Sequence, residues 1–312
     1  AEIDQIRSMI PTVVEHCKHK HPKVRHSAIH CLGQFSTDLK HQFTENFHET
    51  VVPTLYECMA DQINRVKAHA CGSMSNFFEK ASQDIGMNYC EKVLERLLKQ
   101  SKSESSYVCG NAVTCISSLS ESCQQEFSAY YPTVFNEILP VLQKQVPKEF
   151  RKIKGQAIEY LCISSVCAGM KTFRPYAKTL IDALLLVQRE HLGDEEDPQR
   201  KYLLAAWQRL CLLMEKEFAP YLSEIMPELF KMASLKPSLK VSTGEDILDF
   251  LKEVNTSGGN KGVTVASDEL EEKNIGIHML CVIIDELEEK YAPYVEETSK
   301  LFLSLITFDY NS

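Results

Sequence analysis

Residues that break regular secondary structure are scarce in this 312-residue sequence, which holds 12 Gly and 12 Pro. Architectures built from many strands and tight turns use both residues more often, so the composition favours helices. No apolar run approaches the length of about 18 residues that a membrane-spanning helix needs. The sequence also opens without the charged and then apolar segment of a secretory leader. We therefore expect no membrane partner, and the cytoplasm or the nucleus as the compartment.

A disulfide framework is also missing, although the sequence has 12 Cys. No C-x-x-C spacing occurs, and several cysteines, such as Cys58, Cys115 and Cys162, lie within apolar stretches of helical period. In a chain of this length, such thiols are typical of small buried side chains in a reducing compartment.

Negative charge is concentrated in one part of the chain. The net charge is −9, residues 181–312 are strongly acidic, and residues 1–180 carry a small positive excess. An acidic surface repels nucleic-acid phosphate and attracts basic partners. We therefore expect no nucleic acid among the partners, although a solvated face that only aids solubility also explains the charge.

A repeat of 42 residues is the dominant signal in the sequence. Ala28, Ala70 and Ala112 are 42 residues apart, and the same column continues at Ala157 and Ala206 with steps of 45 and 49. A small residue in this column lets two helices cross closely. Within each unit apolar residues recur at helical spacing, which predicts two amphipathic helices. An apolar column with the same steps contains Leu32, Met74, Ile116, Leu161 and Leu210.

These units predict an all-α fold, an α-α superhelix of the HEAT or armadillo type with about six and a half two-helix repeats and no sheet. In such a solenoid each repeat buries its apolar face only against its neighbours. We expect one array over residues 1–312, with approximate repeats at 1–43, 44–86, 87–129, 130–172, 173–217 and 218–290 and a terminal half at 291–312.

Two segments interrupt the repeat and are predicted to be insertions. Residues 191–199 extend a turn between two helices and include four consecutive acidic residues. Residues 240–270 have a centre rich in Gly, Ser and Asn, and their stretch Glu245–Val254 fits a short helix. The rest of this second insertion has the composition of a mobile loop.

No motif predicts catalysis. The sequence contains no G-x-S-x-G, no H-E-x-x-H and no P-loop. The Gly-rich stretch Gly258–Gly262 lacks both the spacing and the preceding strand of a phosphate cradle. We therefore expect a binding protein with no catalytic residues and no cofactor, rather than an enzyme.

Histidines gather near the start of the chain, close to Cys17 and Cys31. His26 and His30 are four residues apart on one predicted helix, a spacing that lets two ring nitrogens meet at one ion. A closed zinc site needs four ligands, however, and both cysteines fall toward packed positions. We therefore expect histidines that face solvent and no metal site. The other histidines of this group are His16, His19 and His21.

Polar side chains recur on the side of the second helices that faces away from the alanine column. In a solenoid of this class the second helices line the concave surface, so these side chains predict a polar and acidic track there. Asn and Gln amides suit the backbone of an extended peptide, and carboxylates suit its Lys or Arg side chains. An ordinary solvated surface explains the pattern equally well. The predicted track contains Gln34, Asn76, Glu79, Ser118, Glu121, Glu159, Gln208 and Glu215.

Several short segments also match the pattern of one known family. They are His21–Arg25, Arg65–Ala70, Asn76–Phe77, Asp197–Gln199, Ala206–Trp207, Glu217–Phe218, Ala233–Pro237 and Leu270–Lys273. In this order, over essentially the whole chain and including both insertions, the sequence resembles the karyopherin-β (importin-β) family, and most closely its importin beta-3 branch.

The resemblance implies a nuclear transport receptor that shuttles between cytoplasm and nucleus and releases protein cargo when Ran-GTP binds. It implies that the second helices hold a lysine-containing localisation signal, a role that falls here to Asn76, Glu79 and Glu121. Nucleoporin FG repeats are further implied partners. Members of the family have many more repeats, so this chain resembles a central fragment, and the main Ran contact belongs to earlier repeats of the full-length receptor.

The sequence departs from the family pattern at one feature, and an alternative function stays open. The family has an Asp–Arg ladder between neighbouring repeats, whereas the column of Arg25 continues here as Lys67, Cys109 and Lys154. This predicts a different geometry between repeats. The alternative function is a HEAT-repeat scaffold or regulatory subunit of another complex with no transport role, and binding of FG peptides separates the two.

Overall fold

Helices make up most of the chain. The computed structural model describes residues 2–144, 147, 151–190, 197–235, 239–241, 263–265 and 267–306. They form two compact units, Ala1–Leu213 and Met214–Ser312. The predicted all-α class is confirmed, and the helices follow one another in the paired order expected of two-helix repeats.

The first unit is built from pairs of helices, each pair consisting of a first helix and a second helix that packs against it. A short 3-10 segment, η1 (Gln124–Ala129), precedes the fourth pair. The first helices are α1 (Glu2–His16), α3 (His41–Cys58), α5 (Gln83–Gln100) and α7 (Tyr131–Gln143). The second helices are α2 (Pro22–Leu39), α4 (Asn64–Glu79), α6 (Ser106–Cys123) and the first part of α8 (Arg151–Glu190).

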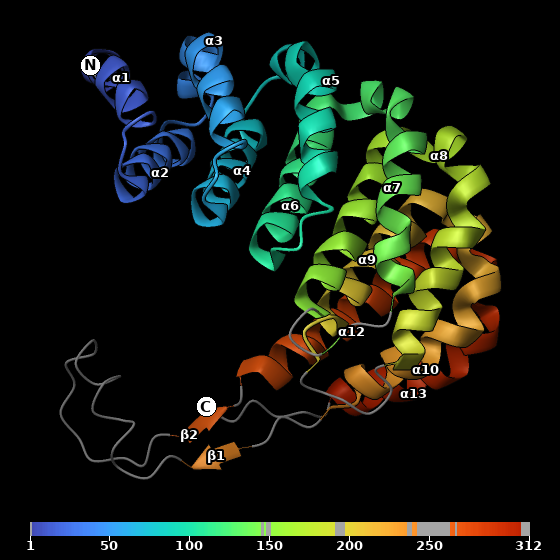
Figure 1. Ribbon diagram of the computed structural model, residues 1–312. Coiled ribbons are helices and arrows are strands. Elements are labelled where there is room, and N and C mark those ends of the chain that lie inside the picture. The colour runs from blue at the N-terminus through green and yellow to red at the C-terminus, as the bar shows by residue number, and fades with distance from the viewer. Residues whose placement is uncertain are drawn as a thin grey trace. The chain divides into compact units, whose positions relative to one another are not determined.

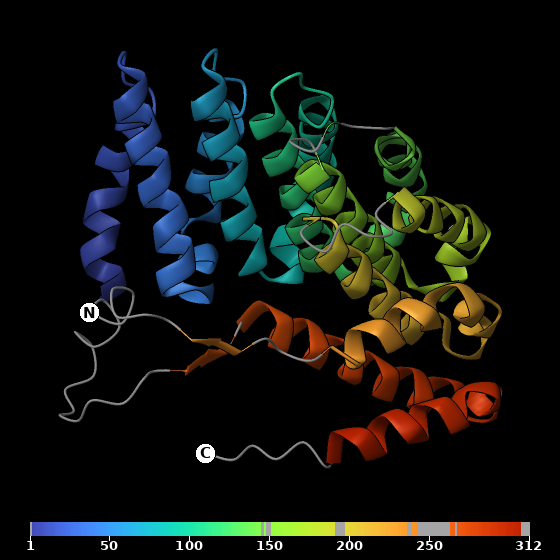
Figure 2. The same ribbon diagram turned by 90° about the horizontal axis from the view of Figure 1, so that it is seen from below.

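The second helices form one continuous layer. Helix α2 packs on α4, α4 on α6, and α6 on α8, while α1, α3 and α5 contact one another along the other side. Figure 1 shows this succession from α1 to α6, and Figure 2 shows the same helices from below. A side chain at a given position of one second helix therefore has a counterpart beside it on the next.

Helix α8 combines two predicted helices in one element. Gly169 interrupts it with a backbone φ of 74°, a left-handed conformation that favours glycine. The part before Gly169 is the second helix of the fourth pair. The part after it is the first helix of the next pair, whose partner is α9 (Arg200–Met214).

The alanine column lies in the core as predicted. Its members in the first unit, Ala28, Ala70, Ala112, Ala157 and Ala206, are all buried. So is the apolar column beside it, Leu32, Met74, Ile116, Leu161 and Leu210. Because every repeat must bury both columns against its neighbours, their common period fixes the spacing of the helices.

The ladder between repeats is better kept than the sequence predicts. Arg25 of α2 donates two hydrogen bonds to Asp61, from Nε at 2.6 Å and from Nη2 at 2.9 Å. The Lys154 ammonium is buried in α8, where it donates to Glu190 Oε2 at 2.9 Å and to the carbonyl of Lys144 at 3.1 Å. At Arg25 the sequence keeps the arginine of the ladder, and the pair forms. At residue 154 the expected departure is wrong, because Lys154 replaces Arg as the donor.

The second unit contains two short 3-10 segments and packed helices. Helix α10 packs on α12, and Gly276 of α12 lies so close that a Cβ there would come within 3.0 Å of the Ala233 backbone nitrogen. Gly276 thus continues the small-residue column. The elements are η3 (Glu215–Tyr221), α10 (Leu222–Ala233), α12 (Ser267–Leu287), η4 (Glu288–Tyr294) and α13 (Val295–Ile306).

A small sheet corrects the prediction that the fold has none. Strand β1 (Leu239–Val241) pairs antiparallel with β2 (Val263–Val265), with Leu239 opposite Val265. Both strands contain β-branched residues, and they lie at the two ends of the predicted insertion 240–270, which explains how its ends come together. The predicted loop centre and the helix expected at 245–254 lie outside the described residues, as do residues 191–196 of the other insertion.

Candidate functional site

Three carboxylates of the predicted track come from neighbouring second helices. Glu79 is the last residue of α4, Glu121 lies in the last turn of α6, and Glu159 lies in the first part of α8. We call these three residues the acidic cluster. Because α4 packs on α6, the 42-residue step places Glu79 and Glu121 at the same ends of adjacent helices.

A hollow of about 450 Å³ lies between the two helix ends and is bordered by both Glu79 and Glu121. The Lys80 ammonium forms an ion pair with the Glu79 carboxylate, and both side chains are partly exposed. A pair of this kind contributes little to stability, so a ligand cation can replace Lys80 at small cost. The hollow is lined by Phe78, Glu79, Lys80, Ala81, Glu121, Ser122 and Gln124.

Glu121 is the electrostatic centre of the acidic cluster. The pKa of its carboxyl is raised, first because the surrounding protein partly desolvates it, and then because Glu79 and Glu159 carry like charge. Water still reaches the residue, which is exposed at the surface. A carboxylate that is surrounded by protein, accessible to water and flanked by like charges is stabilised when a cation binds.

Arg209 of α9 provides a cation close to the acidic cluster. Its Nη2 lies 3.8 Å from Glu159 Oε1, too far for a good hydrogen bond, and its charge opposes the rise of the Glu121 pKa. Its Nη1 is buried and has no hydrogen-bond partner among the residues that the structure describes. Arg209 therefore partly compensates the acidic cluster without a close contact. The sequence reading overlooked it, although it directly follows the predicted site residue Gln208.

Amide side chains of the predicted track also lie on the second helices. Asn76 is exposed on α4, one turn before Glu79, and Gln34 is exposed on α2, where its Nε2 donates to Asp38 Oδ1 at 2.8 Å. Gln208 is half-buried on α9. These amides have donors and acceptors suited to a peptide backbone.

Two members of the predicted track differ from the others: one is buried and one belongs to the second unit. Ser118 is only 7% exposed, and its hydroxyl shares a hydrogen bond of 2.8 Å with the Ser75 hydroxyl at the contact between α6 and α4. Glu215 belongs to the second unit, where it begins η3 with a φ of 48° because α9 ends at Met214. The sequence pattern did not show the contact between α6 and α4 at Ser118, or the end of α9 before Glu215.

Two of the histidines near the start of the chain pack against a histidine of the next repeat, His69. His26 lies with its ring centroid 4.1 Å from that of His69 in α4, and His30 lies 5.2 Å from the same ring. Within the part of the chain that the structure describes, no group of three or more His, Cys, Asp or Glu side chains is arranged to hold a metal ion. In that same part no helix is long and apolar enough to span a membrane.

Comparison with known families identifies two matches to this chain. A family model described as importin subunit beta-1-like, TPR repeats, matches residues 60–258, and a HEAT-repeat model matches residues 9–39. The first match covers more than half of the chain, including the whole acidic cluster.

Individual relatives agree with these matches. Importin subunit beta-3 of Saccharomyces cerevisiae is 28% identical over 301 residues, which is 95% of this chain and 27% of the relative. A probable importin-5 homolog of Dictyostelium discoideum is 25% identical over 242 residues, or 78% of this chain and 21% of the relative. The chain thus spans about a quarter of the length of these curated relatives.

Solved structures show the same arrangement of helices. The karyopherin Kap121p bound to the SUMO protease Ulp1p has a TM-score of 0.81 at 25% identity, over 96% of this chain and 28% of that chain. Kap121p bound to Pho4p has a TM-score of 0.82 at 25% identity, with the same coverage.

Proposed function

Since the chain belongs to the importin-β family, we propose that it is part of a nuclear transport receptor whose acidic cluster binds a basic, lysine-containing localisation signal of a protein cargo. The observation that carries this proposal is the hollow between α4 and α6. Two carboxylates from adjacent repeats border it, and a third lies near enough to raise the pKa of Glu121.

The chemistry of a lysine side chain fits this arrangement. An ammonium group is compact, carries three donors and gains charge-assisted hydrogen bonds from carboxylates. Binding also relieves the repulsion between Glu79 and Glu121, because the added charge is positive. Asn76 on the same helix as Glu79 offers an amide to the peptide backbone on either side of the lysine.

The relatives support a protein ligand. Solved structures of Kap121p include complexes with Pho4p, Ste12p and Nup53p, and each of these partners is a protein. In the full-length receptor we place the other functions of the family: binding of nucleoporin FG repeats, release of cargo by Ran-GTP, and shuttling between cytoplasm and nucleus. The relatives are transport receptors and not enzymes.

A peptide titration tests this function. A lysine-rich localisation peptide should bind the 312-residue chain, and the affinity should fall as salt rises, because partly exposed ion pairs are screened. The matched control peptide has each Lys replaced by Gln. Equal binding of both peptides would contradict the proposal.

A second experiment separates transport from a scaffold role. A transport receptor must bind FG-repeat peptides, whereas a HEAT scaffold of another complex has no such requirement. Full-length receptor that contains this chain should retain FG-repeat peptides in a pull-down, and peptides with Phe replaced by Ser should be lost. Failure to retain either peptide would favour the scaffold.

A further inference from the structure

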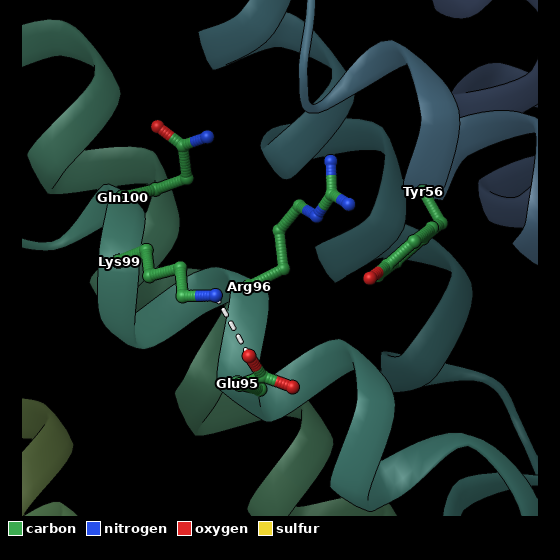
Figure 3. A pocket seen from close by; sticks show the side chains of 5 residues that line it. All are labelled: Tyr56, Glu95, Arg96, Lys99 and Gln100. Carbon is green, nitrogen blue, oxygen red and sulfur yellow. Dashed lines mark hydrogen bonds and ion pairs between the residues drawn. The ribbon is translucent and has the colours of Figure 1, made fainter.

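A second, smaller hollow lies between the first helices α3 and α5, outside the acidic cluster. Its volume is about 150 Å³, and Figure 3 shows the side chains that line it. In this view the Arg96 side chain extends into the hollow toward Tyr56. The lining residues are Tyr56, Glu95, Arg96, Lys99 and Gln100.

Two cations share one aromatic ring at this hollow. The Arg96 guanidinium carbon lies 4.0 Å from the centre of the Tyr56 ring, and Lys92 Nζ lies 4.7 Å from the same centre. Lys92 and Arg96 are four residues apart on α5, so they occupy the same side of the helix, where like charges repel. The negative face of the ring offsets part of this repulsion.

The carboxylate nearest to Arg96 in the hollow forms its ion pair with another cation. The only carboxylate that lines the hollow, Glu95, already pairs with Lys99, whose Nζ lies 2.7 Å from Glu95 Oε1. Neither Lys92 nor Arg96 forms an ion pair within the described part of the chain. Gln100 uses its Nε2 to donate to the Met59 carbonyl at 2.8 Å, which holds its amide beside the hollow.

We propose that this hollow binds the phosphate monoester of a phosphorylated segment of a protein partner. A phosphate monoester carries a charge of about −1.5 to −2 at neutral pH and three acceptor oxygens, and it therefore matches two adjacent cations better than a single carboxylate does. The planar guanidinium of Arg96 presents paired donors to two of these oxygens, and the Lys92 ammonium supplies a second point charge. The phenol of Tyr56 adds a hydroxyl donor.

This site differs in charge and in position from the acidic cluster. It lies on the layer of first helices and binds an anion, whereas the acidic cluster lies on the second helices and binds a cation. The two sites therefore select opposite features of a partner. The inference stands independently of the proposed cargo site, since it uses none of the same residues.

The test is a titration of the whole chain with a short phosphoserine peptide flanked by Gly and Ala. Its unphosphorylated and Glu-substituted forms, and inorganic phosphate, serve as comparisons. The phosphoserine peptide should bind at least about tenfold more tightly than the other two peptides. Its affinity should weaken between about pH 7.5 and about pH 5.5, because the second phosphate pKa is about 6. Inorganic phosphate should compete with it.

Matched variants distinguish a built site from general charge. Lys92→Gln with Arg96→Gln should abolish the preference for the phosphoserine peptide. Lys102→Gln with Lys178→Gln removes the same charge from two exposed lysines that already pair with Glu137 and Asp182, and should preserve the preference. Tyr56→Leu should weaken binding, since it removes the ring that holds both cations, while thermal unfolding reports whether each variant folds.

Four outcomes would overturn the inference. The first is equal affinity for the phosphorylated and Glu-substituted peptides. The second is equal loss in the two double variants, which would mean a general effect of positive charge. The third is full retention of the preference in the folded Lys92→Gln, Arg96→Gln variant. The fourth is binding of inorganic phosphate without binding of the phosphoserine peptide, which would rule out a peptide ligand.

Discussion

At the scale of single residues, Arg209 offsets part of the negative charge of the acidic cluster. Its Nη2 lies 3.8 Å from Glu159 Oε1, and its buried Nη1 has no hydrogen-bond partner in the described part of the chain. It competes with any ligand cation for the same carboxylates, but it gains little itself, because the distance is long for a hydrogen bond.

Replacing Arg209 with Gln should therefore strengthen the binding of a lysine-rich peptide. Loss of a partly exposed charge near the acidic cluster corresponds to roughly three- to tenfold in affinity. Isothermal titration measures the change. Lys201→Gln, on the same helix α9 but on its exposed side, is the control and should have a smaller effect. Weaker binding by Arg209→Gln would show that Arg209 contacts the peptide and does not compete with it.

His69 couples the stability of the first repeats to pH. Its pKa is lowered to about 4 from an ordinary 6.5, first by burial and then by the charges of His26, His30 and Arg65. The unfolded chain therefore binds a proton at a higher pH than the folded chain does. The free energy of unfolding should fall as pH drops from about 6.5 to about 4, by at most about 3 kcal/mol.

Urea unfolding at several pH values tests this coupling. His69→Gln should flatten the profile between about pH 6.5 and about pH 4, because the titrating ring is gone. His41→Gln removes an exposed histidine and should leave the slope unchanged. An equal slope in wild type and His69→Gln would refute the role of His69.

The sequence predicted the acidic cluster but not the membership of every residue. Glu79 and Glu121 repeat at 42 residues on helices that pack side by side, so column spacing alone placed them together. Ser118 follows Asn76 by the same 42 residues, yet its small side chain lies within the contact of α6 with α4, where it pairs with Ser75. The periodicity of one helix does not show where the neighbouring helix lies, and the neighbouring helix decides whether such a side chain is exposed or buried.

At the scale of elements, ion pairs between consecutive repeats hold the second helices in register. The bidentate pair of Arg25 with Asp61 is largely shielded, with side-chain exposures of 17% and 9%. Partial burial alone would raise the pKa of Asp61, but hydrogen bonds from Arg25 and from the Ile63 backbone lower it overall. The pair therefore stabilises the fold above the unfolded carboxyl pKa of about 3.9 and is lost as pH falls through the lower folded value.

Asp61→Asn should lower the free energy of unfolding by roughly 1–3 kcal/mol, because it leaves the Arg25 charge without its partner. Glu57→Gln is a matched control: its pair with Lys18 is exposed on both sides and should contribute less than about 1 kcal/mol. Chemical denaturation at neutral pH measures both. An equal loss of unfolding free energy in the two variants would mean that the shielded pair stabilises the fold no more than the exposed pair does.

Elements that break the period were the hardest to predict. Gly169 lets one continuous element supply the second helix of one repeat and the first helix of the next. The sheet of β1 and β2 joins segments more than 20 residues apart. Its three-residue strands are too short to produce a recognisable alternation, so the sequence predicted no sheet there.

At the scale of the whole chain, the repeat carried the prediction of the fold. Apolar columns that recur once in each repeat can all be buried only if the helix pairs stack on one another. The fold class therefore follows from the sequence before any individual contact is known. The division at Leu213 was not predicted, because it follows from long-range contacts that the repeat pattern does not contain. The boundaries of the individual repeats stay a prediction.

Binding of a basic peptide by the acidic cluster is the central proposal for this chain. The most direct measurement is the affinity of a lysine-rich peptide for the chain with Glu79→Gln and Glu121→Gln, compared with Glu57→Gln and Glu91→Gln, which remove two exposed carboxylates from the first helices α3 and α5. The first variant should bind about tenfold more weakly or worse, with nearly unchanged thermal stability, while the second should bind much as the wild type does. Equal affinities in the two variants, with both proteins folded, would contradict the claim.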